Sequence, residues 1–141
     1  MSHRYLDHTA DLAVEVRAAS LNQLFAEAAT ALTECLVEPA RVASREQRGI
    51  ELEAADLDRL LVAWLHEVLF AFETHRLLAL RAEVAVEPGE RGGWRLRGAL
   101  FGEPVDFERH PPKVLIKGVS YHGLHVEQTG GAWLAKVVFD I

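Results

Sequence analysis

The chain has 141 residues, of which 50% are apolar and 26% are charged. This balance excludes an intrinsically disordered protein, and the length predicts one domain spanning residues 1–141. The formal net charge of −6 argues against a protein that grips a nucleic acid backbone without sequence preference.

The first half of the chain alternates between strand and helix patterns. Apolar and polar residues alternate over residues 11–17, which predicts a strand with one buried face. Ser20 offers an N-cap for a helix whose apolar residues recur at helical spacing until Pro39 ends it. A short strand is expected over residues 49–53. The apolar stripe over residues 56–74 predicts a second helix.

After the second helix, the apolar period changes to two, as in strands. The strands are expected over residues 78–86, 94–100, 114–126 and 133–141. Glycine-rich turns at 88–93 and 128–131 separate two pairs of them, and the third strand is expected to bend near Gly118 or Gly123. Together these elements predict an α+β fold, with a mixed β-sheet packed against two main helices on one face.

The sequence shows no targeting segment. Asp7, His8 and Asp11 stand where a signal peptide needs an apolar run. The most apolar stretch, residues 60–72, is too short to span a bilayer and is interrupted by charged and polar residues. Cys35 is the single cysteine and excludes an intrachain disulfide framework. We therefore expect a cytoplasmic protein that does not contact a membrane.

Three carboxylates stand at the two ends of the sequence. Asp11 and Asp140 each lie opposite the apolar residues of their strands, and the α-carboxylate of Ile141 is adjacent to Asp140. If the two strands are neighbours, the carboxylates converge, and a divalent cation would relieve their repulsion. The alternative is two unrelated surface aspartates and a solvated terminus. The segment 7–11 also has two interpretations. It is either a polar turn or part of a cation site.

The histidines and lysines give weaker signals. A four-ligand zinc site has little support, because His122 and His125 are three apart in a strand and His66 has no histidine at i+4. Cys35 falls in a helical apolar stripe, which favours a place in the core. Five basic residues or histidines lie close together in sequence: Arg109, His110, Lys113, Lys117 and His122. They could form a local positive patch, or they could be a solvated loop and a strand edge protected by lysine.

Several motifs, taken in order, resemble one family over essentially the whole chain. They are residues 5–11 (YLDHTAD), 20–29 (SLNQLFAEAA), 60–69 (LLVAWLHEVL), 117–122 (KGVSYH) and 138–141 (VFDI). The sequence is identified as similar to the archeases. It departs from the family pattern at Gly118, where alanine is usual, at Ser120, where threonine is usual, and at His66, where asparagine is common.

The resemblance implies an accessory protein rather than an enzyme. Its partner would be the RNA-splicing ligase, which joins a 3′-phosphate or 2′,3′-cyclic phosphate end to a 5′-hydroxyl end in tRNA splicing or RNA repair. The protein would promote ligase guanylylation and multiple turnover, and would meet RNA only through the ligase. The resemblance also implies a metal site at Asp11, Asp140 and Ile141. It would hold calcium, with manganese or magnesium as alternatives.

Two other functions remain open at the level of the sequence. One is a stand-alone metal-dependent hydrolase using Asp7, His8, Asp11 and Asp140. The other is a general chaperone or adaptor without chemistry, for which the aspartates would be dispensable. The sequence assigns no role to His8, His110, Lys117 and His122.

Overall fold

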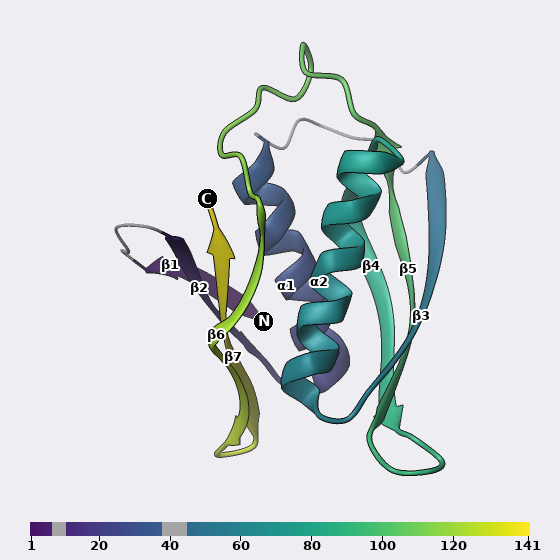
Figure 1. Cartoon of the computed structure of the whole chain (residues 1–141), viewed down its shortest axis with the longest axis vertical. Coiled ribbons are helices and arrows are strands. Elements are labelled where there is room, and N and C mark those ends of the chain that lie inside the picture. Colours follow the sequence, from purple (N-terminus) through teal and green to yellow (C-terminus); the bar gives the residue numbers. More distant parts are fainter. Residues whose placement is uncertain (7–10, 38–44) are drawn as a thin grey trace.

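The computed structural model describes residues 1–6, 11–37 and 45–141. Within these ranges the chain forms two helices and seven strands (Figure 1). In chain order they are β1 (Ser2–Leu6), β2 (Asp11–Ala18), α1 (Leu21–Leu36), β3 (Glu46–Ala54), α2 (Leu57–Thr74), β4 (Leu77–Pro88), β5 (Trp94–Pro104), β6 (Gly118–Thr129) and β7 (Ala132–Asp140).

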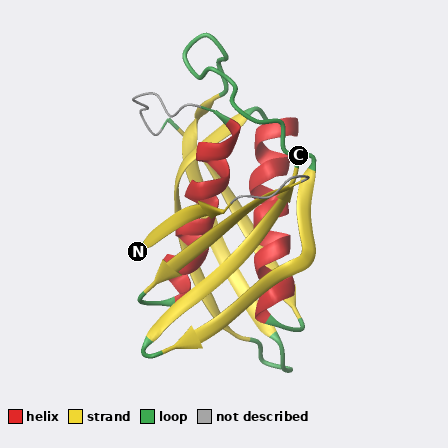
Figure 2. Ribbon diagram, turned by 90° about the vertical axis from the view of Figure 1, so that its left-hand side faces the viewer, coloured by secondary structure: helices red, strands yellow, loops and turns green. Residues whose placement is uncertain are grey.

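The strands form two separate sheets with the helices between them. One sheet has four strands in the order β1-β2-β7-β6, and the other has three in the order β3-β5-β4. Figure 1 shows α1 and α2 in the middle with one sheet on either side, and Figure 2 shows the four-stranded sheet in front of the helices. Both helices contact strands of both sheets. The molecule therefore has three layers, sheet, helices and sheet.

The α+β class and the two main helices are confirmed, but the strands do not form one mixed sheet. Every strand pairing among the described residues is antiparallel. The strands on either side of α2, β3 and β4, run parallel, as expected for a strand–helix–strand unit. However, β5 lies between them and is antiparallel to both. The chain also changes sheets along α1, so the helices are covered on two sides rather than packed on one face of one sheet.

Each helix begins after an N-cap, which is Ser20 as predicted for α1 and Asp56, the first residue of the predicted second helix, for α2. The Ser20 hydroxyl accepts a hydrogen bond from the backbone N–H of Gln23 at 3.2 Å, and the Asp56 carboxylate accepts one from Arg59 at 2.8 Å. The predicted stop of the first helix, Pro39, lies outside the described residues, and α1 ends at Leu36.

One hydrophobic core unites the three layers. Its largest fully buried side chains include Phe25 from α1, Trp64 from α2, Leu100 from β5 and Phe139 from β7. Burying a side chain of this size contributes about 1.5–3 kcal/mol. The Trp64 indole N–H also donates to the Phe25 carbonyl at 2.8 Å, which joins the helices. Cys35 is 4% exposed and belongs to this core, as expected.

The four-stranded sheet contains one strand that the sequence analysis missed and one that is shorter than predicted. The missed strand is β1, whose five residues lack apolar alternation. Residues 114–117 precede β6, which begins at Gly118. The predicted bend lies between Ser120 and His125, where the β6–β7 register shifts and Gly123 has a φ of +79°. Neither helix of the described chain combines the length and apolar character needed to cross a bilayer.

Candidate functional site

Asp11 and Asp140 lie directly opposite each other in the sheet. Strands β2 and β7 pair antiparallel, and Asp11↔Asp140 is the end of a register that continues to Ala18↔Trp133. Side chains opposite each other on an antiparallel pair share a face, with Cβ atoms about 4.5–5.5 Å apart, and like charges in this arrangement destabilise the sheet. The structure therefore brings together the two aspartates that the sequence analysis singled out.

Strand β6, which pairs with β7 on the side away from β2, also contacts Asp140. Gly118 of β6 pairs with Asp140, and the backbone N–H of Lys117 donates to the Asp140 carbonyl at 2.7 Å. A Cβ on Gly118 would lie 3.8 Å from Oδ2 of Asp140, so this carboxylate reaches over the glycine. Asp140 is thus anchored from both neighbouring strands, and the α-carboxylate of Ile141 follows one residue later.

The surroundings of the two carboxylates are apolar on one side. Ala13 and Val138 form a row two residues further along on the same face, and both are buried. Asp11 is half-buried with Oδ1 shielded from solvent, whereas Asp140 is exposed. Partial burial lowers the effective dielectric constant, which strengthens both the repulsion between the carboxylates and their attraction to a cation.

The donor chemistry of this row fits a hard divalent cation. Carboxylate oxygens are the ligands that calcium, magnesium and manganese prefer, whereas structural zinc sites use mainly cysteine and histidine. Among the described side chains, no group of three or more His, Cys, Asp and Glu residues is arranged so that it could hold a metal ion. A third protein ligand would therefore be the α-carboxylate of Ile141 or come from residues 7–10. Asp7 and His8 lie outside the described residues.

The predicted histidine candidates do not assemble into a site. His122 and His125 are exposed, and His125 lies 3.2 Å from a carboxylate oxygen of Glu127. The Nε2 atom of His66 accepts a hydrogen bond from the backbone N–H of Val119 at 3.3 Å. His66 therefore joins α2 to β6 as a hydrogen-bond acceptor.

The structure also disfavours the positive patch. His110 is fully buried, with Nε2 2.6 Å from Oε1 of Glu103, while its Nδ1 accepts a hydrogen bond from the N–H of Asp106. The guanidinium of Arg109 lies 3.2 Å from the same Glu103 oxygen. Two of the five residues proposed for the patch, Arg109 and His110, therefore contact a carboxylate of the protein itself. Lys117 instead lines a groove next to α2.

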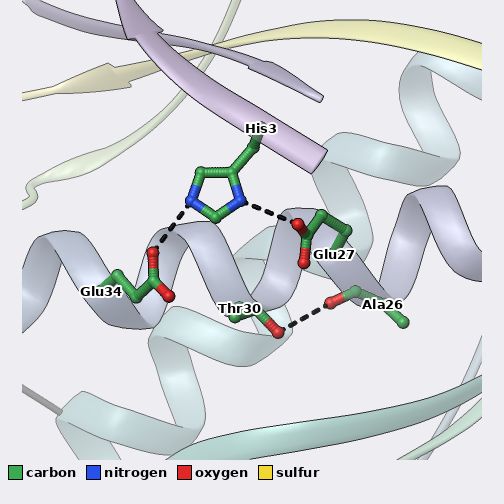
Figure 3. A network of polar contacts seen from close by, with 5 residues as sticks. All are labelled: His3, Ala26, Glu27, Thr30 and Glu34. Carbon is green, nitrogen blue, oxygen red and sulfur yellow. Dashed lines mark hydrogen bonds and ion pairs between the residues drawn. The ribbon is translucent and has the colours of Figure 1, made fainter. Parts of the chain in front are cut away.

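A second charged cluster was missed by the sequence analysis because it depends on β1. The His3 ring lies between two carboxylates of α1, with Nδ1 2.9 Å from Glu27 and Nε2 2.9 Å from Glu34 (Figure 3). Burial opposes the charged ring, but the two carboxylates outweigh it, so the pKa of His3 is raised above its usual value. Only the imidazolium has an N–H on both ring nitrogens, so it can donate to both carboxylates at once. These two contacts fasten β1 to α1.

Comparison with known proteins identifies the family. Residues 3–141 match the model of the Archease protein family (MTH1598/TM1083). The chain belongs to the archease family. It is 39% identical over 136 residues to the archease of Methanopyrus kandleri, covering 96% of both chains. It is 35% identical over 143 residues to that of Archaeoglobus fulgidus, covering the whole of both.

Solved archease structures share the fold described above. The solution structure of protein 1598 from Methanobacterium thermoautotrophicum matches 99% of this chain and 98% of its own, with a TM-score of 0.83 and 28% identity. The crystal structure of a Thermotoga maritima archease, described as a possible chaperone, matches 96% of this chain and 94% of its own. Its TM-score is 0.63 at 19% identity, which supports the fold alone.

Proposed function

We propose that this archease activates an RNA-splicing ligase by promoting its guanylylation with GTP and its repeated turnover in tRNA splicing or RNA repair. The observation that carries the proposal is the Asp11–Asp140 row, found in a chain that matches the archease family from residue 3 to residue 141. The row offers oxygen ligands but contains neither a nucleophilic serine or cysteine nor a histidine base among its described residues. We therefore assign the bond-forming chemistry to the ligase and the accessory role to this protein.

We further propose that Asp11, Asp140 and the α-carboxylate of Ile141 hold a divalent cation. Calcium is the first candidate, and manganese and magnesium are the alternatives. When bound, the cation supplies a concentrated positive charge that can order a phosphate or a carboxylate of the partner. The chain's own contribution is rigidity. Asp140 is held from both neighbouring strands, and the Lys117 N–H fixes its carbonyl.

The ligase is the protein partner in this proposal, and RNA is met only through it. The net charge of −6 supports that arrangement, because an acidic surface repels the phosphates of free RNA. The proposal also places the protein in the cytoplasm with its partner.

A ligation assay tests the proposal. Multiple-turnover joining of a 3′-phosphate end to a 5′-hydroxyl end is measured with GTP, limiting manganese and this protein at well below one equivalent of ligase. We expect a clear rise in turnover with the native protein. With Asp140→Asn the rise should fall by about tenfold or more, because one ligand charge is lost. The matched control is Asp106→Asn, since Asp106 is exposed and asparagine preserves the hydrogen bond that Oδ1 accepts from the Glu108 N–H.

Three outcomes would contradict the proposal. Undiminished stimulation by Asp140→Asn would remove the carboxylates from the mechanism. Hydrolysis of a phosphoester by the protein alone, lost in Asp11→Asn, would identify a hydrolase. Equal protection of many unrelated proteins from aggregation by the native and Asp140→Asn forms, without an effect on ligation, would identify a general chaperone.

A further inference from the structure

A groove lies between the second half of α2 and the start of β6. It has a volume of about 340 Å³. Its lining includes Glu67, Leu69, Phe70 and Glu73 of α2, together with Lys117 and Gly118. Gly118 is also the cross-strand neighbour of Asp140. The groove and the candidate cation site therefore adjoin each other at this glycine.

The groove carries exposed apolar surface. Phe70 is 45% exposed, although the other large apolar residues of α2 are buried or partly buried against the core. Two more exposed apolar side chains flank the Lys117–Asp140 hydrogen bond in sequence, Leu115 at 74% and Ile141 at 43%. Of these three, Phe70 lines the groove itself. An exposed aromatic ring in a groove between charged side chains offers apolar contact area to another molecule.

Two carboxylates flank the aromatic ring along the helix. Glu67, Phe70 and Glu73 are spaced three residues apart, so each lies on the next turn, with a rise of about 4.5 Å per step. No ion pair joins Glu67, Glu73 or Lys117 to any other group in the part of the chain that the structure describes. By contrast, Glu83 and Glu87 on the three-stranded sheet pair with Arg81 and Arg95. The groove thus presents two carboxylates and one ammonium group around an apolar centre.

We propose that this groove docks a segment of the partner protein in which two arginine side chains flank an apolar residue. The apolar residue packs on Leu69 and Phe70. Each guanidinium meets one of the two glutamates and can lay its face on the Phe70 ring. The inference rests on the proposed function for the identity of the partner, the ligase. The charge argues against RNA as the occupant, because its phosphates would face Glu67, Glu73 and Asp140.

A docked segment would lie next to the candidate cation site. Because Gly118 lines the groove and pairs with Asp140, a partner held at Phe70 is brought to the strand row that carries Asp140. The groove then determines where the cation is presented. Loss of the groove is expected to weaken binding of the ligase while leaving the affinity for calcium unchanged.

Binding of the purified ligase to the full chain tests the groove. We expect Glu67→Gln combined with Glu73→Gln to raise the dissociation constant about tenfold, and Phe70→Ala to do the same. Phe70 and Glu73 are exposed and Glu67 is half-buried, and none of them belongs to the core, so the fold should persist. An unchanged melting temperature checks this. Glu51→Gln combined with Glu53→Gln is the matched control. It removes the same charge from exposed positions on the three-stranded sheet and should change the constant less than twofold. Unchanged affinity in both groove variants would overturn the inference, even if the native protein stimulates ligation.

A peptide probe separates this inference from the proposed function. A capped hexapeptide of alternating arginine and leucine is titrated into the isotopically labelled protein, and amide shifts are followed by NMR. Shifts centred on residues 66–73 and 117–118, lost in the double glutamine variant, support the groove even if the protein does not stimulate the ligase. Absent shifts, shifts elsewhere, or shifts at these residues with a single-stranded RNA oligonucleotide would overturn it.

Discussion

Two places in this protein bring a pair of carboxylates together, and they balance the charge differently. On α1, Glu27 and Glu34 are bridged by His3, so the counter-ion is a side chain of the same chain. In the four-stranded sheet, Asp11 and Asp140 face each other across one row, and we propose that the balancing charge comes from solution. The first cluster should respond to pH and the second to the concentration of a divalent cation.

The comparison also shows what each arrangement is suited to do. The His3 and Glu27 side chains are only 14% and 11% exposed, Glu34 is 36% exposed, and the three together fasten one edge strand to a helix. Asp140 is exposed and stands beside a groove. A satisfied internal cluster stabilises the fold, whereas an exposed pair with an exchangeable cation can be presented to another molecule.

The largest expected effect is on the second cluster, through calcium. We expect calcium at about one hundred times its dissociation constant to stabilise the native protein by about 2.7 kcal/mol. A chelator should reverse this. Asp140→Asn should lose the calcium response and, without calcium, should melt slightly higher, because a like-charge pair has been removed. Thermal melts with calcium and with a chelator measure both effects. A full calcium response in Asp140→Asn would contradict the assignment, and Asp106→Asn serves as the control.

A smaller effect should follow from changing only the chain end. A short polar extension after Ile141 replaces the α-carboxylate by a neutral amide, while the side chains of Asp11 and Asp140 remain. We expect calcium affinity to fall about tenfold, since affinity follows the number of charged ligands. The same extension placed before Met1 should have a milder effect. Calorimetric titration compares the two proteins, and equal affinities would remove Ile141 from the ligand set.

The smallest effect concerns the first cluster and pH. Because folding raises the pKa of His3, the imidazolium contributes its full stability below the unfolded pKa of about 6.5 and loses it as pH rises through the folded pKa. We expect His3→Gln to cost about 1 kcal/mol at pH 5.5 and less at pH 9. Denaturant unfolding at the two pH values measures this. His125→Gln is the control, because His125 also meets a glutamate but lies at the surface. A cost that does not depend on pH would show that His3 is not the charged clamp.

The features that sequence predicted well are those with a local cause. Ser20 caps the first helix as predicted, and the apolar stripes of α1 and α2 enter the core, because capping and helical periodicity depend on residues within a few positions of each other. The alternation in β7 correctly separated Asp140 from the buried Phe139. The orientation of each aspartate on its strand was therefore predictable.

The features that sequence did not determine depend on distant pairing. The match of Asp11 with Asp140 joins strands from opposite ends of the chain, so its register had to be seen in the structure. Because β5 lies between β3 and β4, their sheet is antiparallel instead of mixed, and the other four strands form a second sheet. The burial of His110 follows from its contact with Glu103, although a loop rich in proline and charge reads as exposed in sequence.

The place of β7 in its sheet also has a consequence for how the protein forms. β7 is an inner strand, between β2 and β6, and its hydrogen-bonding partner β2 leaves the ribosome long before it. During synthesis, α1 follows β2 directly and can cover its apolar face, but the backbone edge of β2 that pairs with β7 must wait for residues 132–140. Pairing between strands that are distant in sequence is slow, and the unpaired strand edge can aggregate in the meantime. We therefore expect the four-stranded layer to assemble last, after the helices and the β4–β5 hairpin.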